Sequence, residues 1–332
     1  MPAVKLAGRL RRNWPVALAV LLLAAAVWLP PVDVPRDTWR YMITIDVTQS
    51  MDVEDTGDPK APASRLAAAR AAVREALRRM PCGSEVGLAV FADYRALPLL
   101  LPVEVCANYD ALLAAVDGID SRMAWLNASN ITKGLYWILR MAHTLGHDTR
   151  IVFITDGHES PPLRPSEHSI LNVTPGEVEG WLAGVGGDIP VPIPRSDTEG
   201  NRTGYWKADD VVQLDAMQPN VPRGQSHEEL SSLHEAHLES LAKQTGLGYR
   251  RLSRPEVLAD AMLASRLAHR QAVRTDVRWV PALLALVLLA GVFLPDALRP
   301  WRWRFVRRVF RRGRPAASPD STPLPTGVRL GP

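Results

Sequence analysis

The sequence is poor in cysteine, with only Cys82 and Cys106 among its 332 residues. A zinc centre built from several thiolates is therefore disfavoured. The two cysteines flank two apolar runs, 85–93 and 95–105, which a turn centred on residue 94 joins into an antiparallel hairpin. In such a hairpin the two cysteines face each other, so we expect a structural disulfide in an oxidising compartment. The alternative is a pair of unrelated buried thiols.

The central part of the chain also lacks an excess of basic residues. Residues 36–278 contain more acidic than basic side chains, and the basic excess lies in residues 1–35 and 279–332. A domain that binds nucleic acid needs a basic patch on its folded surface, so nucleic acid is not expected as a partner. The basic tail is better suited to anionic lipid headgroups.

Two long runs, 13–32 and 279–295, lack charged residues altogether. Both reach the lower limit of about 17 apolar residues for a membrane-spanning helix. Basic residues lie on the side of each run nearer the chain end, and such residues mark the cytoplasmic side of a span. We therefore expect a two-pass protein of a bacterial inner membrane, with a cytoplasmic basic N-terminus (1–12), a periplasmic central domain and a basic, partly disordered cytoplasmic tail (296–332). The alternatives are a cleaved signal peptide for the first run and a buried core helix for the second.

Between these runs, strand and helix patterns alternate. Buried strands are expected at 40–46, 150–156, 181–186 and 248–252, and helices at 64–80, 108–117, 130–146, 234–245 and from about 255. This alternation predicts an α/β fold with a mostly parallel central sheet, to which the hairpin adds one antiparallel edge strand.

One segment, 187–226, is rich in proline, glycine and polar residues and is predicted to be a long loop. It follows the end of a predicted strand, so it should lie on the face where open α/β sheets bind ligands. Tyr205 and Trp206 near its middle are expected either to contact a partner or to pin the loop to the domain.

Two of the predicted strands end in aspartate, at Asp46 and Asp156. Parallel strands bring their carboxyl ends to one edge of a sheet, and Thr48 and Ser50 follow Asp46 at alternate positions. Carboxylates and hydroxyls in a small group are hard oxygen ligands that suit Mg²⁺. The acidic residues that follow this motif are expected to be solvated: Asp52, Glu54, Asp55 and Asp58.

These elements resemble a von Willebrand factor A domain, whose metal-ion-dependent adhesion site reads Asp-x-Ser-x-Ser, then a distant threonine, then aspartate. Asp46, Thr48 and Ser50 match the first element, with threonine in place of the first serine. "SNITKGL" (129–135) aligns Ser129 with the distant threonine, and Thr132, one helical turn on, is the competing choice. Asp156 matches the last element. The resemblance covers residues 38–265 and implies a Rossmann-like domain holding Mg²⁺, or Ca²⁺ or Mn²⁺ in its place.

The chain also resembles the bacterial MxaL type, encoded with methanol dehydrogenase genes, and the related Bat-type proteins. This resemblance rests on the two apolar runs that flank the domain, on "DVTQSMDVED" and on "IPVPIPRSDTEGNRTGYW". The resemblance implies a non-enzymatic module whose metal takes an acidic residue from a partner protein. The partner would be a periplasmic quinoprotein methanol dehydrogenase or its accessory proteins, and the role would be maturation, including insertion of Ca²⁺.

Three other functions stay open. A Bat-type scaffold would serve another envelope complex, and in a purely structural scaffold the metal would only stabilise the fold. A metal-assisted hydrolase would use His158 and Glu159, which follow Asp156 at the start of a proline-rich stretch. A helix is usual at 157–180 in the resembled family, and the prolines make one improbable at its start.

Overall fold

The computed structural model describes residues 14–163, 173–197, 199–217, 222 and 224–293. The predicted cytoplasmic N-terminus and tail therefore lie outside the described residues. The chain divides into two compact units. One comprises residues 33–274, and the other comprises the segments on either side of it.

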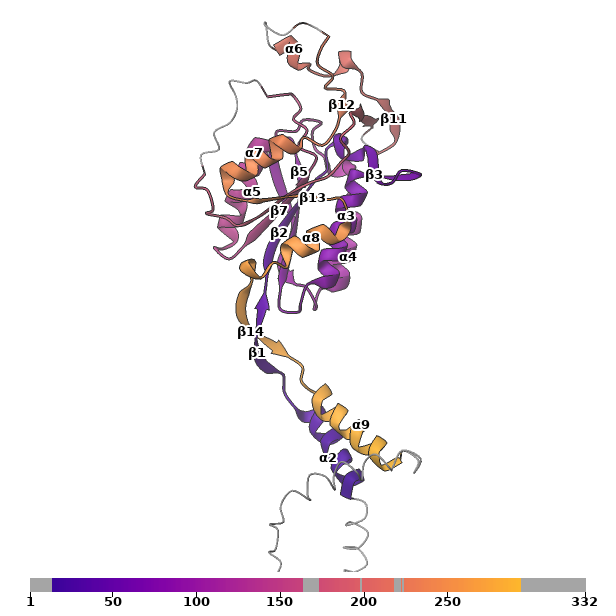
Figure 1. Ribbon diagram of the computed structural model, residues 1–332, viewed down its shortest axis with the longest axis vertical. Helices are drawn as coiled ribbons and strands as arrows, with labels where there is room; N and C mark the ends of the chain where they lie inside the picture. The colour runs from indigo at the N-terminus through magenta and orange to yellow at the C-terminus, as the bar shows by residue number, and fades with distance from the viewer. Residues whose placement is uncertain (1–13, 164–172, 198, 218–221, 223, 294–332) are drawn as a thin grey trace, which may run out of the picture. The chain divides into compact units, whose positions relative to one another are not determined.

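The unit at 33–274 is built on a six-stranded sheet in the order β13-β8-β7-β2-β5-β6 (Figure 1). Its strands are β2 (Arg40–Asp46), β5 (Glu85–Ala92), β6 (Arg95–Glu104), β7 (Arg150–Thr155), β8 (Gly180–Gly184) and β13 (Gly248–Arg251). All neighbouring strands are parallel except β5 and β6, which are antiparallel. The predicted sheet, mostly parallel with one antiparallel edge strand, is confirmed.

Helices cover both faces of this sheet (Figure 1). On one face lie α3 (Arg65–Arg79), α4 (Tyr109–Gly118) and α8 (Pro255–Met262), and on the other α5 (Ile131–Leu145) and α7 (Glu235–Thr245). Strand β7 shows how one strand serves both layers, since Val152 packs in the first core and Phe153 in the second. Burial on both faces explains why the central strands read as unbroken apolar runs.

A disulfide joins Cys82 and Cys106 at the open end of the β5–β6 hairpin, with the Cα atoms 5.2 Å apart. The bridge expected from the sequence is therefore present. The strands do not keep the constant register that the prediction assumed, because bulges shift the pairing around Leu88. The turn itself is tight, and Asp93 adopts a left-handed conformation there with φ of 59°.

Several elements were not predicted. A ribbon of β1 (Val32–Thr38) and β14 (His269–Thr275) forms a separate two-stranded sheet, and β3 (Glu54–Asp58) pairs with β4 (Ala61–Ser64). The 187–226 segment, predicted to be a loop, contains short elements instead. These are β9 (Val191–Pro192), β10 (Pro194–Ser196), β11 (Arg202–Tyr205), the 3₁₀ turn η4 (Ala208–Asp210) and α6 (Leu214–Met217). β10 pairs with β11. β9 pairs with β12 (Leu230–Ser231), so the start of the segment is hydrogen-bonded to the chain just after its end.

The second unit contains α2 (Trp14–Trp28) and α9 (Trp279–Phe293), which pack against each other. The Nε of Arg278 donates to the carbonyl oxygen of Leu29 at 3.0 Å beside them. Each helix has 15 described residues and is apolar around its circumference. In the described part of the chain, no helix has the length and apolar character that crossing a bilayer requires. The two membrane spans stay predictions.

Candidate functional site

The site is built where two central strands end. Asp46 is the last residue of β2 and Asp156 follows β7, and these strands are parallel neighbours. Both carboxylates are fully buried. The Asp46 carboxylate accepts hydrogen bonds from the backbone N–H and the hydroxyl of Thr48, at 2.9 and 2.7 Å. It also accepts one from the hydroxyl of Thr155, at 2.7 Å. The topology thus brings the two predicted aspartates to one edge of the sheet.

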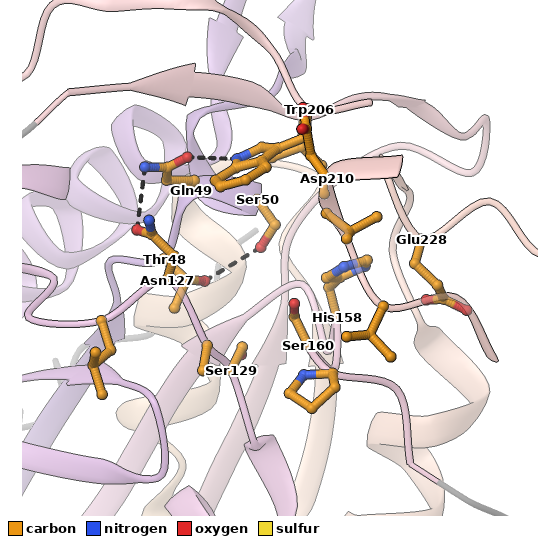
Figure 2. A pocket seen from close by; sticks show the side chains of 16 residues that line it. Thr48, Gln49, Ser50, Asn127, Ser129, His158, Ser160, Trp206, Asp210 and Glu228 are labelled. Carbon is orange, nitrogen blue, oxygen red and sulfur yellow. Dashed lines mark hydrogen bonds between the residues drawn. The ribbon is translucent and has the colours of Figure 1, made fainter. Parts of the chain in front are cut away.

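Hydroxyl groups gather around Asp46. After β2 the chain turns through the 3₁₀ segment η1 (Gln49–Asp52), which places the Thr48 and Ser50 hydroxyl oxygens 3.3 Å apart (Figure 2). Ser129 approaches from the loop before α5, and its backbone N–H and C=O both bond to Ser160 at 2.7 Å. The Ser129 hydroxyl is buried and has no hydrogen-bond partner among the described residues.

Thr132, the alternative to Ser129, has a different role. It lies in the first turn of α5, and its hydroxyl donates to the Glu159 carboxylate at 3.1 Å. It does not line the pocket that contains Thr48, Ser50 and Ser129. Of the two candidates, Ser129 is therefore the one that the fold brings to the Asp46 hydroxyl cluster.

Arg65, the first residue of α3, completes the site and was missed by the sequence analysis. Its guanidinium is fully buried and bonds to the Asp156 carboxylate at 2.5 Å. Through Nη2 it bonds to the Asp55 carboxylate at 2.6 Å, and through Nη1 to the Ser231 hydroxyl at 2.7 Å. The prediction that Asp55 is solvated was wrong, because its side chain is only 10% exposed and pairs with Arg65. Buried charges of this kind require such partners.

The two strand-end aspartates differ in their electrostatics. Burial, together with the nearby Asp156, raises the pKa of Asp46 to about 7. Burial also acts to raise the pKa of Asp156, but the Arg65 guanidinium, His158 and hydrogen bonds together outweigh it, so the pKa lies below its usual range. Among the residues described, no Lys, Arg or His side chain forms an ion pair with Asp46. Within the described part of the chain, the buried carboxylate of Asp46 thus lacks a counter-charge, whereas that of Asp156 has one.

A pocket of about 330 Å³ opens above the hydroxyls (Figure 2). Thr48, Ser50 and Ser129 line it on one side, and residues of the 187–226 segment line it on another. Trp206 fixes that segment in place, because its indole N–H donates to the Gln49 side chain at 2.6 Å. The contacts of Trp206 therefore fit the expectation that it pins the segment to the domain. Tyr205 is 53% exposed, and a partner contact there stays a prediction.

Glu159 and His158, the two residues considered for hydrolysis, have different surroundings. The Glu159 carboxylate accepts from the backbone N–H groups of Ile131 and Thr132 at 3.0 and 3.2 Å, and so caps helix α5. It also contacts His237 at 3.1 Å. His158 lines the pocket, and burial lowers its pKa to about 4, so its ring is neutral near pH 7. Glu159 is therefore committed to the helix end, and His158 is a weak base.

The donor set fits a hard divalent cation. Asp46 offers a carboxylate that no described cationic side chain balances, and Thr48, Ser50 and Ser129 offer hydroxyl oxygens of the kind that Mg²⁺ and Ca²⁺ accept. The unpartnered Ser129 hydroxyl is the observation that fits a cation best, since buried polar atoms are rarely left without a partner. Asp156, already held by Arg65, is suited to bind through a water molecule.

The segment that carries this site is similar to known proteins. Residues 41–158 match the von Willebrand factor type A domain. A UPF0353 protein of Mycolicibacterium paratuberculosis is 32% identical over 165 residues, which are 47% of this chain and 47% of that protein. A UPF0353 protein of Mycobacterium ulcerans is 31% identical over 157 residues, 45% and 44% of the two chains. The chain spans about half the length of these curated relatives.

Solved structures also resemble the chain. An aerotolerance-related membrane protein from Bacteroides fragilis has a TM-score of 0.45 at 19% identity and covers 68% of this chain and 96% of its own. BatB from Bacteroides thetaiotaomicron has a TM-score of 0.48 at 17% identity and covers 69% of this chain and 98% of its own. The finer resemblance to the MxaL type stays a prediction. The segment that matches the von Willebrand factor type A domain thus runs from β2 to just beyond Asp156.

Proposed function

We propose that this chain is a non-enzymatic, membrane-anchored module that binds a partner protein through a divalent cation, Mg²⁺ in the first instance. Asp46, Thr48, Ser50 and Ser129 would hold the cation, with Asp156 bound through water. The observation that carries the proposal is the convergence of these hydroxyls on a buried carboxylate that has no counter-charge among the described residues. When bound, the cation would supply a coordination position for an acidic side chain of the partner.

The pocket supports binding rather than catalysis. It leads from the surface to the hydroxyls, so a side chain of a partner has a route to the cation. A hydrolase needs a general base within reach of the metal-bound water. Glu159 is taken up by the α5 terminus, and the low pKa of His158 makes it a poor proton acceptor.

The finer proposal concerns place and partner. The domain would lie in the periplasm of a bacterial inner membrane and would assist maturation of a quinoprotein methanol dehydrogenase, including its Ca²⁺ insertion. The disulfide supports an oxidising compartment. The partner rests on the resemblance of "DVTQSMDVED" and of the 187–226 segment to the MxaL type, with a Bat-type scaffold of another envelope complex as the alternative.

Metal binding is tested by isothermal titration of the purified full chain with Mg²⁺, Mn²⁺ and Ca²⁺. We expect binding by the wild type, loss of binding in Asp46→Asn and weakened binding in Ser129→Ala. Asp58→Asn is the matched control, because Asp58 is an exposed acid in the same part of the chain. Unchanged binding in Asp46→Asn would show that the cation lies elsewhere.

Partner binding is tested by affinity capture from native membranes, in Mg²⁺ and in EDTA, with captured proteins identified by mass spectrometry. A periplasmic dehydrogenase or its accessory proteins should be captured by the wild type in Mg²⁺, and lost in EDTA and with Asp46→Asn. The same set of captured proteins under all conditions would mean that the site has only a structural role.

A further inference from the structure

The pocket above the hydroxyl cluster has apolar walls. Leu126 and Pro161 line it from loops of the central fold, and Ile193, Val211 and Val212 line it from the 187–226 segment. Leu126 and Val212 are 53% and 52% exposed, so both present apolar surface to solvent. Exposed apolar groups around a few polar ones are typical of binding sites. A ligand that enters the pocket can therefore make apolar contacts with the walls in addition to presenting a carboxylate.

The wall contributed by the 187–226 segment is held firmly against the hydroxyl cluster. The Ile193 carbonyl accepts from the Trp206 backbone N–H at 3.0 Å, and the Ile193 N–H donates to the Glu229 carbonyl at 3.0 Å. The Trp206 ring stacks under the Arg195 guanidinium, whose carbon lies 4.7 Å from the ring centroid. With its bond to Gln49, Trp206 ties this wall to the turn that carries Thr48 and Ser50 (Figure 2).

Two acidic residues, Asp210 and Glu228, also line the pocket. Asp210 is partly balanced by Arg195, 3.6 Å away. Glu228 lies among other acids, and burial together with Glu229 and Asp215 raises its pKa. A ligand that brings more than one carboxylate would meet this negative charge, whereas a single carboxylate can pass to the cation. The pocket lining thus favours a ligand with a single acidic group over a ligand with several acidic groups in succession.

Resting on the function proposed above, we propose that the pocket recognises an extended segment of a partner protein in which a single acidic residue lies between bulky apolar residues. The acidic side chain would reach the cation, and its neighbours would cover Leu126 on one wall and Val212 on the other. The volume of about 330 Å³ is at the small end of ligand pockets, which span roughly 300–1,000 Å³. It suits a few side chains of an extended segment and is too small to enclose a helix of about 10 Å diameter.

Three fluorescent peptides test this specificity against the full chain in Mg²⁺, by anisotropy: Gly-Leu-Glu-Leu-Gly, Gly-Ser-Glu-Ser-Gly and Gly-Glu-Glu-Glu-Gly. The leucine-flanked peptide should bind about tenfold more tightly than the serine-flanked one, as expected for two partly buried leucines. The all-glutamate peptide should bind most weakly. EDTA should abolish binding of all three. Equal affinities for the three peptides, or no binding by any of them to the Mg²⁺-loaded chain, would overturn the inference.

Variants separate this inference from metal binding. Leu126→Ser and Val212→Ser should each lose most of the preference for leucine flanks, with Mg²⁺ affinity unchanged in the titration. Leu97→Ser is the matched control, because Leu97 is 52% exposed on β6 and does not line the pocket. An unaltered preference in both pocket variants would overturn the inference and leave the metal site standing. No Mg²⁺ binding by the wild type would overturn the proposed function and this inference with it.

Discussion

Arg65 is the buried charge on which the architecture of the site depends, and its removal gives the sharpest prediction. Arg65→Met keeps an aliphatic side chain in α3 but removes the guanidinium that pairs with Asp156 and Asp55. Two carboxylates then lose their partner, one fully buried and the other 10% exposed. We predict that the variant is strongly destabilised without metal and recovers more stability than the wild type when Mg²⁺ is added.

The magnitude follows from the burial of this network. Breaking a buried ion pair by removing one partner costs about 3–5 kcal/mol, which is a large part of the roughly 5–15 kcal/mol that stabilises a domain. A cation at a hundredfold excess over its Kd stabilises the wild type by about 2.7 kcal/mol. In Arg65→Met the stabilisation by the cation should be about 1–3 kcal/mol larger than in the wild type, because no guanidinium beside Asp156 repels the cation.

The assay is urea unfolding of the full chain followed by tryptophan fluorescence, in EDTA and in saturating Mg²⁺. Arg74→Met is the matched control on the same helix. Its ion pair with Asp117 is exposed, so the change should cost no more than about 1 kcal/mol and leave the Mg²⁺ increment unaltered. The reasoning is refuted if Arg65→Met in EDTA stays within about 1 kcal/mol of the wild type, or if both gain equally from Mg²⁺.

Three further predictions follow from the same structure. Because the pKa of Asp46 is raised to about 7 in the folded state, its ionisation destabilises the metal-free fold as pH rises from about 4 to about 7. Asp46→Asn should remove this loss, which is about 4 kcal/mol over the whole range and about 3 kcal/mol between pH 5 and pH 8; urea unfolding in EDTA at these two pH values checks it, and an unchanged pH dependence contradicts it. Replacing Cys82 and Cys106 by serine should lower the unfolding free energy by about 3 kcal/mol, given their separation of 24 residues, with the reduced wild type as the comparison. Gly180→Ala should cost about 2 kcal/mol or more in thermal unfolding, because φ is 149° and the new Cβ would lie 2.0 Å from a backbone oxygen of β7; Gly118→Ala, in open space, is the control, and equal melting temperatures for the two would refute this.

The local part of the site could be predicted from the sequence. Asp46 and Asp156 each end an apolar run, and parallel pairing of such runs brings their ends together without further information. The spacing of Thr48 and Ser50 then places two hydroxyls near one carboxylate. The disulfide was equally accessible, because a turn centred on residue 94 brings Cys82 and Cys106 together even though bulges shift the pairing between them.

The rest depends on contacts between distant segments. Arg65 in the first turn of a helix suggests a solvated side chain, and nothing near it in the sequence points to Asp156, 91 residues away. Asp55 was misassigned for the same reason, since its partner became visible only in the folded chain. In the 187–226 segment, β9 pairs two residues with β12, which is too short for any periodicity to show.

On the function proposed above, the β1–β14 ribbon would determine how a pull on a bound partner passes through the domain. The chain enters through β1 directly before β2 and leaves through β14, so both connections meet the domain at the edge of the sheet opposite the carboxyl ends of its strands. A partner held at those carboxyl ends pulls along β2, whose seven residues span roughly 23 Å. Because Asp156 follows the neighbouring strand β7, part of such a load would pass from β2 to β7 and shear the ladder between them along its length. On the function proposed above, the site would be coupled to the β1–β14 ribbon along the strand direction of the sheet.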